Sequence, residues 1–319
     1  MKTFDEIYNE LQNSDNNELN NLWKEAKAKG EKANKISLTI CLTIDILAII
    51  IFLYIGTIFK SLFALMFIVA PVLIANIFVY VIVNLIFSGK EKNKYNEKYK
   101  EVVIKKLMTN FYDNLEYFPQ KEMPEYIYEE AKYNEYYDNY ESEDYFEAQI
   151  DNKYSMQMAE ILTQEEQEYE NSEGETETRM ITKFHGLFAK IVIDKSLNSE
   201  LKIMQNGGIL KSDRLNMDSS EFEKHFDVQA SNQIIGMQLL TADVMQELID
   251  FKNNTNMDYD IIIRNSNIYL RFHCEDMFET GNLKKEPLNK EMIKKYFYML
   301  NFTYNVSKRL IDIINETQI

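Results

Sequence analysis

Two long apolar runs near the N-terminus constrain this chain more than any other feature. The first covers residues 36–58 and the second covers residues 62–87. Each is longer than the roughly 20 residues that a helix needs to cross about 30 Å of hydrocarbon. A secretory signal peptide would have a shorter apolar stretch and a small-residue cleavage site, and here a second span follows at once. The pattern predicts a transmembrane hairpin.

One acidic residue, Asp45, interrupts the first run, which also holds 14 Ile, Leu and Phe residues. Each of these favours insertion by about 0.3 to 0.6 kcal/mol, whereas a central Asp costs roughly 3 kcal/mol, so insertion is favoured. Folding the hairpin about its turn brings Asp45 to the depth of Asn76. We expect a protonated Asp45 to hydrogen-bond Asn76 across the helices. Two alternatives stay open: Asp45 reaches the inner headgroups or a partner subunit, or it lines a transport pathway in an oligomer.

Lysines flank the hairpin on both sides, whereas the turn of about residues 59–61 holds only Lys60. The flanking lysines are Lys24, Lys27, Lys29, Lys32 and Lys35 before the first span and Lys90, Lys92, Lys94, Lys98 and Lys100 after the second. Positive charge favours the inner side of a membrane. The sequence therefore predicts a multi-pass protein of the cell membrane with both termini in the cytoplasm and the lipid bilayer as a partner. Its two cysteines, Cys41 and Cys274, provide no disulfide framework.

The remaining chain is acidic, with a net charge of −16. Residues 122–178 hold 19 acidic and two basic residues, and seven tyrosines interleave the first half of this segment, residues 122–150. Those tyrosines are Tyr126, Tyr128, Tyr133, Tyr136, Tyr137, Tyr140 and Tyr145. Such a surface argues against a nucleic-acid partner, because binding a phosphate backbone depends on Lys and Arg. This segment either binds a basic protein or forms a solvated surface with half-buried tyrosines. The solvated surface is the commoner arrangement.

Four segments follow from these patterns. Residues 1–35 form a cytoplasmic helical segment that begins with a capping box of Thr3 and Glu6. Residues 36–88 hold the hairpin, and residues 89–121 hold a juxtamembrane helix from Lys90 to about Asn114. Residues 122–319 make the acidic cytoplasmic domain.

Alternating and β-branched runs predict strands in that domain, and apolar stripes predict two helices. The strands are expected at 154–169 and 179–195, as a long hairpin, and at 201–204, 226–229, 258–264 and 268–273. The turn-like residues 265–267 predict a second hairpin between the last two strands. Helices are expected at 241–251, capped by Thr241, and from Asn289 to about Ile314. The fold class is α+β: a transmembrane hairpin, then a mainly antiparallel sheet with flanking helices.

No catalytic, metal or cofactor motif is recognisable. The nine glycines form no phosphate-binding loop, and the three histidines lack zinc-ligand spacing. Glu141, Glu143 and Asp144 could bind a divalent cation, but they lack the ligand spacing and the glycine of a calcium loop. We therefore expect neither a resident metal nor a cofactor, and the residues favour a protein without enzymatic activity.

Several stretches carry a resemblance to a known family. They include Phe184, Gly186, Leu187 and Phe188, then Phe222, Glu223, Phe226 and Val228, then Leu240 and Thr241, then Asn267 to Leu270, and finally Phe278 and Glu279. In these stretches and in its two adjacent spans the chain resembles a bacterial membrane-protein family catalogued as domain of unknown function 3137. The resemblance implies a cytoplasmic domain behind the spans and no established activity. We interpret Phe222, Phe226 and Phe278 as core anchors.

Three functions are compatible with these observations. The first is a non-enzymatic, membrane-tethered scaffold or binding protein with a protein partner. The alternative is a membrane-anchored enzyme or small-ligand sensor whose site forms only in the fold, from His185, Glu223, His225 and His273. A channel-like homo-oligomer, resting on Asp45, Asn76 and Asn84, comes third.

Overall fold

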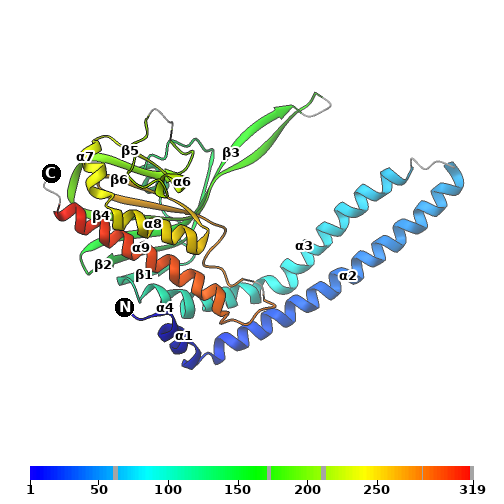
Figure 1. Ribbon diagram of the computed structural model, residues 1–319. Coiled ribbons are helices and arrows are strands. Elements are labelled where there is room, and N and C mark those ends of the chain that lie inside the picture. The colour runs from blue at the N-terminus through cyan, green and yellow to red at the C-terminus, as the bar shows by residue number, and fades with distance from the viewer. Residues whose placement is uncertain (60–63, 171–173, 210–212, 282, 317–319) are drawn as a thin grey trace. The chain divides into compact units, whose positions relative to one another are not determined.

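The structure is a computed structural model, and it describes residues 1–59, 64–170, 174–209, 213–281 and 283–316. Side chains are described for these residues except 55–59, 64–69 and 198. The chain divides into two compact units. One comprises Met1–Tyr8, Val103–Glu279 and Lys290–Ile319, and the other comprises Asn9–Val102 and Thr280–Asn289. Figure 1 labels the helices and strands.

The N-terminal helix α1 covers Phe4–Asn13 and begins as its sequence predicts. The Glu6 carboxylate accepts a hydrogen bond from the Thr3 backbone N–H at 2.7 Å, and the Thr3 hydroxyl accepts one from the Glu6 N–H at 3.4 Å. This reciprocal pair is the predicted capping box. Helix α2 then runs through Asn17–Phe59 and α3 through Ala64–Tyr99.

Helices α2 and α3 are both long and apolar enough to cross a membrane. Only 6% of the most apolar 18-residue stretch of each helix is buried inside the chain, whereas the core helices of soluble proteins are mostly buried. Large apolar side chains such as Leu38, Ile46 and Phe78 stand exposed. Lipid is the medium that covers such faces without cost. The predicted turn at residues 59–61 lies mostly outside the described residues.

The predicted juxtamembrane helix ends earlier than expected. After α3 the chain forms a π-helical turn at Lys100–Ile104 and a short helix, α4, at Lys105–Met108. The strand β1 follows at Asp113–Phe118, so the expectation of helix to Asn114 was wrong at its end. The reason is tertiary, because β1 alternates in burial and pairs with β2 at the edge of the sheet.

One six-stranded antiparallel sheet organises the first unit. Its strands after β1 are β2 (Asn139–Ile150), β3 (Tyr154–Glu170), β4 (Thr176–Gln205), β5 (Phe226–Ala230) and β6 (Asp258–His273). Strands β1 to β5 pair in sequence order, and β6 pairs with β4. The predicted long hairpin is the β3–β4 pair. Together with the helices, this sheet confirms the α+β class.

The second predicted hairpin is wrong, because residues 258–273 form the single strand β6. Both halves of β6 pair with the long strand β4: Ile268 lies opposite Ile191, and Ile262 lies opposite Lys202. Between these stretches the register shifts, and Asn265 takes a positive φ of 54°. The polar residues that suggested a turn instead lie inside β6, opposite the stretch of β4 in which bulged extra residues shift the register.

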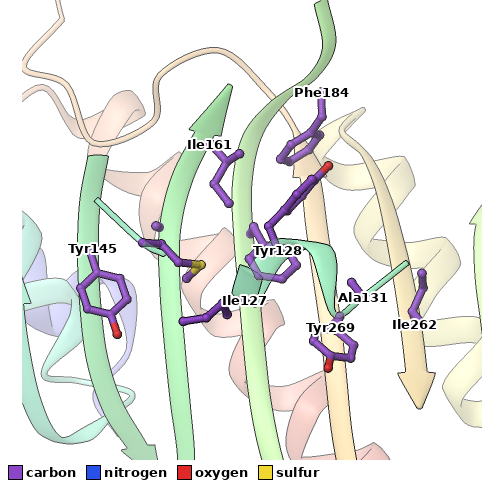
Figure 2. Close-up of a cluster of buried hydrophobic side chains, with 11 residues drawn as sticks. Ile127, Tyr128, Ala131, Tyr145, Ile161, Phe184, Ile262 and Tyr269 are labelled. Atoms are coloured by element: carbon purple, nitrogen blue, oxygen red, sulfur yellow. The ribbon is translucent and has the colours of Figure 1, made fainter. Parts of the chain in front are cut away.

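Helices cover both faces of the sheet. On one face, α8 (Ala242–Thr255) and α9 (Lys290–Glu316) meet β6, where Phe302 packs on Phe272 and stacks on Phe251 at 3.7 Å between ring centroids. The stripes predicted for these two helices are buried, as expected. On the other face lies the short helix α5 (Glu125–Glu129), as Figure 2 shows. Two further short helices, α6 (Phe222–His225) and α7 (Gln233–Leu239), flank β5.

Candidate functional site

The structure brings together the two polar residues singled out in the hairpin. The Asn76 amide donates a hydrogen bond to the Asp45 carboxyl at 2.8 Å, and the Cys41 thiol lies 3.7 Å from the Asn76 carbonyl oxygen. Small residues such as Ala33 and Ser37 are buried in the same unit. The Asn76 side-chain oxygen is buried and has no hydrogen-bond partner among the described residues.

Replacing Asp45 with leucine should weaken the hairpin by about 0.6 kcal/mol and at most about 1.7 kcal/mol, the range found for hydrogen bonds between membrane helices. The matched control is Asn84→Leu, because the Asn84 amide bonds the Tyr80 carbonyl within its own helix. SDS titration of the full chain, followed by the fluorescence of its single tryptophan, Trp23, measures the change. Equal midpoints for the two variants would show that the pair contributes nothing.

Most of the tyrosines in the acidic segment lie against the sheet. Tyr128 on α5 is buried and stacks on Phe184 of β4 at 5.8 Å between ring centroids. Tyr133, Tyr137 and Tyr140 pack against the same cluster, which Figure 2 shows under α5. Tyr126 and Tyr136 are the exposed members of the predicted set. The segment is therefore a cover on one face of the sheet, and it leaves little aromatic surface for a partner.

A buried charged network lies under this cover. The Arg271 Nε atom donates to the Asp260 carboxylate at 2.6 Å, and its other two nitrogens bind both oxygens of Glu135 at 2.8 and 2.7 Å. The guanidinium also lies 3.8 Å from the ring centroid of Tyr133. The His273 ring nitrogen lies 2.9 Å from the same Asp260 oxygen that Arg271 contacts. Because the side chains of Asp260 and Arg271 are 0% and 3% exposed, their charges depend on one another.

The network fixes the charge of Asp260. Burial alone would raise the pKa of this carboxyl, but hydrogen bonding from His273 and the positive charge of Arg271 lower the pKa overall from its ordinary 3.8. A carboxyl with a lowered folded-state pKa stabilises the fold above its unfolded pKa, and this contribution is lost as the pH falls through the folded pKa. Burial likewise raises the pKa of Tyr128 to about 12. Both groups therefore keep one protonation state near neutral pH, which is typical of a structural network.

A pocket of about 490 Å³ gathers carboxylates at the start of β2 and the middle of β3. Its ionisable lining residues are Glu122, Glu141, Glu143, Glu160, His185 and Asp276. Carboxylate oxygens of Glu143, Asp144 and Glu160 lie within 4.8 Å of one another. Oxygen atoms so placed suit a hard divalent cation. Of the three residues considered from the sequence, Glu141 lines the pocket but stands outside this group, and Glu160 replaces it.

Glu160 and Asp144 also have structural roles. One Glu160 oxygen accepts hydrogen bonds from the backbone N–H groups of Met277 and Phe278, each at 2.7 Å. The Tyr117 hydroxyl donates to Asp144, and burial, followed by the charge of Asp144, raises the pKa of Tyr117. Because Glu160 is buried on β3, it ties the connection after β6 to the centre of the sheet.

The residues proposed for a fold-assembled catalytic or sensing site do not gather in one pocket. His185 contacts Asp276 at 2.8 Å in the acidic pocket, and His273 belongs to the Arg271 network. Glu223 accepts the backbone N–H of Met217 at 2.8 Å, and the His225 ring lies beside Phe226. Each of the four thus has a separate local partner.

Six of the motif residues that carried the resemblance take mostly core positions: Phe184, Gly186, Phe222, Glu223, Phe226 and Phe278. Phe222, Phe226 and Phe278, which we interpreted as core anchors, are buried, and Phe184 is buried as well. Gly186 has a φ of 150° and lies between Ile161 of β3 and His273 of β6. Glu223 closes a turn instead of facing a pocket.

Beyond the body of the sheet, β3 and β4 continue as a two-stranded ribbon formed by residues 164–170 and 176–182 (Figure 1). Nearly all of its side chains are exposed or half-buried on both faces. Sequence reasoning predicted the hairpin but not that its outer half would extend without a covering layer. It also missed Arg271, Asp260 and Glu135. The available signal was the presence of acidic and basic residues, Asp260 and Arg271 among them, inside the otherwise apolar strand β6.

Residues 182–311 match the model of a family described as protein of unknown function (DUF3137). The chain therefore contains a DUF3137 domain. That domain includes β5, β6, α8 and most of α9, together with Asp260, Arg271 and all six motif residues. Glu135 and Tyr133 lie before residue 182, in the acidic segment. Residues outside the matched region therefore complete the contacts of Arg271 inside it.

Curated proteins gave no match. Among solved structures, the chain is similar to the crystal structure of the mycobacterial trehalose monomycolate transport factor A, with a TM-score of 0.31 and 5% identity over 67% of this chain and 94% of that one. A likeness this distant carries no argument about function.

Proposed function

We propose that this chain is a membrane-tethered protein-binding or scaffold module. In this proposal α2 and α3 span the cell membrane, both termini lie in the cytoplasm, and the unit with the DUF3137 domain meets a protein partner there. The lysines on both sides of the hairpin support this orientation. The lipid bilayer holds the module in place, and the partner supplies the function.

The observation that carries the proposal is the exposed ribbon formed by residues 164–170 and 176–182. An isolated two-stranded hairpin is at best marginally stable in water, because it buries too little apolar surface to offset the entropy of ordering it. The ribbon continues two strands of a stable sheet, which hold it in shape away from the core. Exposed strand pairs of this kind offer side chains and strand edges to another chain.

Photocrosslinking in intact membranes tests this function. A photoreactive residue at Thr178, an exposed ribbon position, should give a discrete adduct with another protein. The matched control carries the same residue at Asp312, an exposed position on α9. Adducts of the same size and yield at the two positions, or none at Thr178, would contradict a partner that recognises the ribbon. An adduct consisting of two copies of this chain would identify the partner as the chain itself.

A further inference from the structure

The two faces of the ribbon differ in charge. Strand alternation places Glu166, Glu168 and Glu170 on one face, opposite Met180, Thr178 and Thr176 respectively. We call this side the glutamate face. The other face carries Glu165, Gln167 and Tyr169, opposite Ile181, Arg179 and Glu177, and Lys183 follows nearby.

On the second face, the acidic and basic side chains contact one another. Lys183 contacts Glu165 at 3.2 Å, and the Tyr169 hydroxyl donates to Glu177 at 2.5 Å. The Arg179 guanidinium lies 5.5 Å from the ring centroid of Tyr169. Two basic residues thus stand beside two acidic ones, and this face presents little net charge to a partner.

The glutamate face has no such compensation. Among the residues that the structure describes, its three carboxylates form no ion pair, and the residues opposite them are neutral. Met180 is 43% exposed and adds an apolar contact at the end of the face nearest the body of the sheet. Three like charges along one strand repel each other, so the arrangement disfavours the isolated ribbon and favours a cationic neighbour.

We propose that the glutamate face binds an extended segment of a partner protein that carries Lys or Arg at alternate positions. Side chains two residues apart on a strand lie about 6.8 Å apart, and an extended partner repeats its own side chains at the same spacing. Each glutamate then meets one cation, and the intervening side chains reach Met180 and the threonines. This inference rests on the proposed function, and it specifies which face of the ribbon recognises the partner and by what chemistry.

The experiment uses the detergent-solubilised full chain and a fluorescent peptide of alternating Thr and Lys. Anisotropy should show binding that weakens strongly between 50 mM and 500 mM salt, because exposed charges are screened over shorter distances at higher salt. A peptide of the same composition with its lysines adjacent tests the spacing. Equal affinity for the two peptides would overturn the alternate-position geometry.

Two triple variants test the face. E166Q/E168Q/E170Q should weaken binding of the alternating peptide by about tenfold, the combined effect of three exposed ion pairs. E165Q/E175Q/E177Q removes the same number of charges from the ribbon but leaves the glutamate face intact, and it should change affinity by less than about twofold. Thermal melting of both variants checks that the ribbon stays folded.

The outcomes separate this inference from the function on which it rests. If Thr178 forms its adduct but the two triple variants bind the peptide equally, the glutamate face is wrong and the protein-binding function stands. If Thr178 forms no adduct, both fail. A partner captured through Thr178 whose contacting segment lacks alternating basic residues would also overturn the inference.

Discussion

Replacing Arg271 with alanine should lower the free energy of unfolding by about 3 to 5 kcal/mol, the typical result of removing one partner from a buried ion pair. The variant leaves the Asp260 carboxylate with a side-chain exposure of 0% and without its guanidinium. It also removes the bidentate contact to Glu135, which fastens the acidic cover to the sheet. The cover should therefore loosen together with the loss of stability.

The control for this variant is Arg309→Ala, because Arg309 and Asp243 form an ion pair with both side chains largely exposed. Exposed pairs contribute less than about 1 kcal/mol. Chemical denaturation of the full chain in detergent measures both variants, and hydrogen exchange across residues 122–138 reports on the cover. An Arg271 variant as stable as the Arg309 variant would show that the buried network has no stabilising role.

Replacing Gly186 with alanine should have a comparable effect, of the order of 3 kcal/mol, because overpacking and an unfavourable φ act together. A Cβ atom at this position would lie 1.8 Å from the Phe272 carbonyl oxygen and 2.9 Å from the Cys274 backbone nitrogen. Both are backbone atoms, so no rotamer change relieves the contact. The φ of 150° is a conformation that residues with side chains rarely adopt.

Gly30→Ala is the matched control, since a Cβ at that helical position meets nothing within 4 Å. Alanine in a helix is favoured over glycine by up to about 1 kcal/mol, so this variant should be neutral or slightly stabilising. Thermal melting of the two variants side by side tests the difference. If both melt as the parent protein does, the close approach at Gly186 is not required for the fold.

Gly186 also lies near the base of the ribbon, where the pairing of β4 with β6 ends. From Gly186 to Ile191, β4 pairs with both β3 and β6. Before Gly186 it pairs with β3 alone, and this part of β4 leads out into the ribbon. The Cys274 backbone N–H closes the end of the β4–β6 pairing on the His185 carbonyl at 3.0 Å. A side chain that pushed β6 away here would disturb the base from which the ribbon extends. The family-like glycine thus supports both the core and the proposed binding element.

Features that depend on local periodicity can be predicted from the amino-acid sequence alone. Two apolar runs longer than a membrane is thick predict two spanning helices whatever follows them. The stripe that includes Ile293, Phe297 and Leu300 predicts a buried helix face, and Thr3 with Glu6 predicts a helix start, because partners three or four residues apart meet in any helix. The alternation in residues 154–169 likewise predicts a strand in any sheet.

Which distant residues share an environment depends on how the chain folds and cannot be read from local patterns. Asn265 to Asn267 have the composition of a turn, yet pairing with the long strand β4 keeps them inside one continuous strand. Glu135 and Arg271 lie 136 residues apart in the chain, so no local pattern could join them. The strand partner of each ribbon residue decides which glutamates stand unpaired on the same face. The pairing register between strands determines these cross-strand partners. The sequence of a single strand shows only which residues share one face of the sheet.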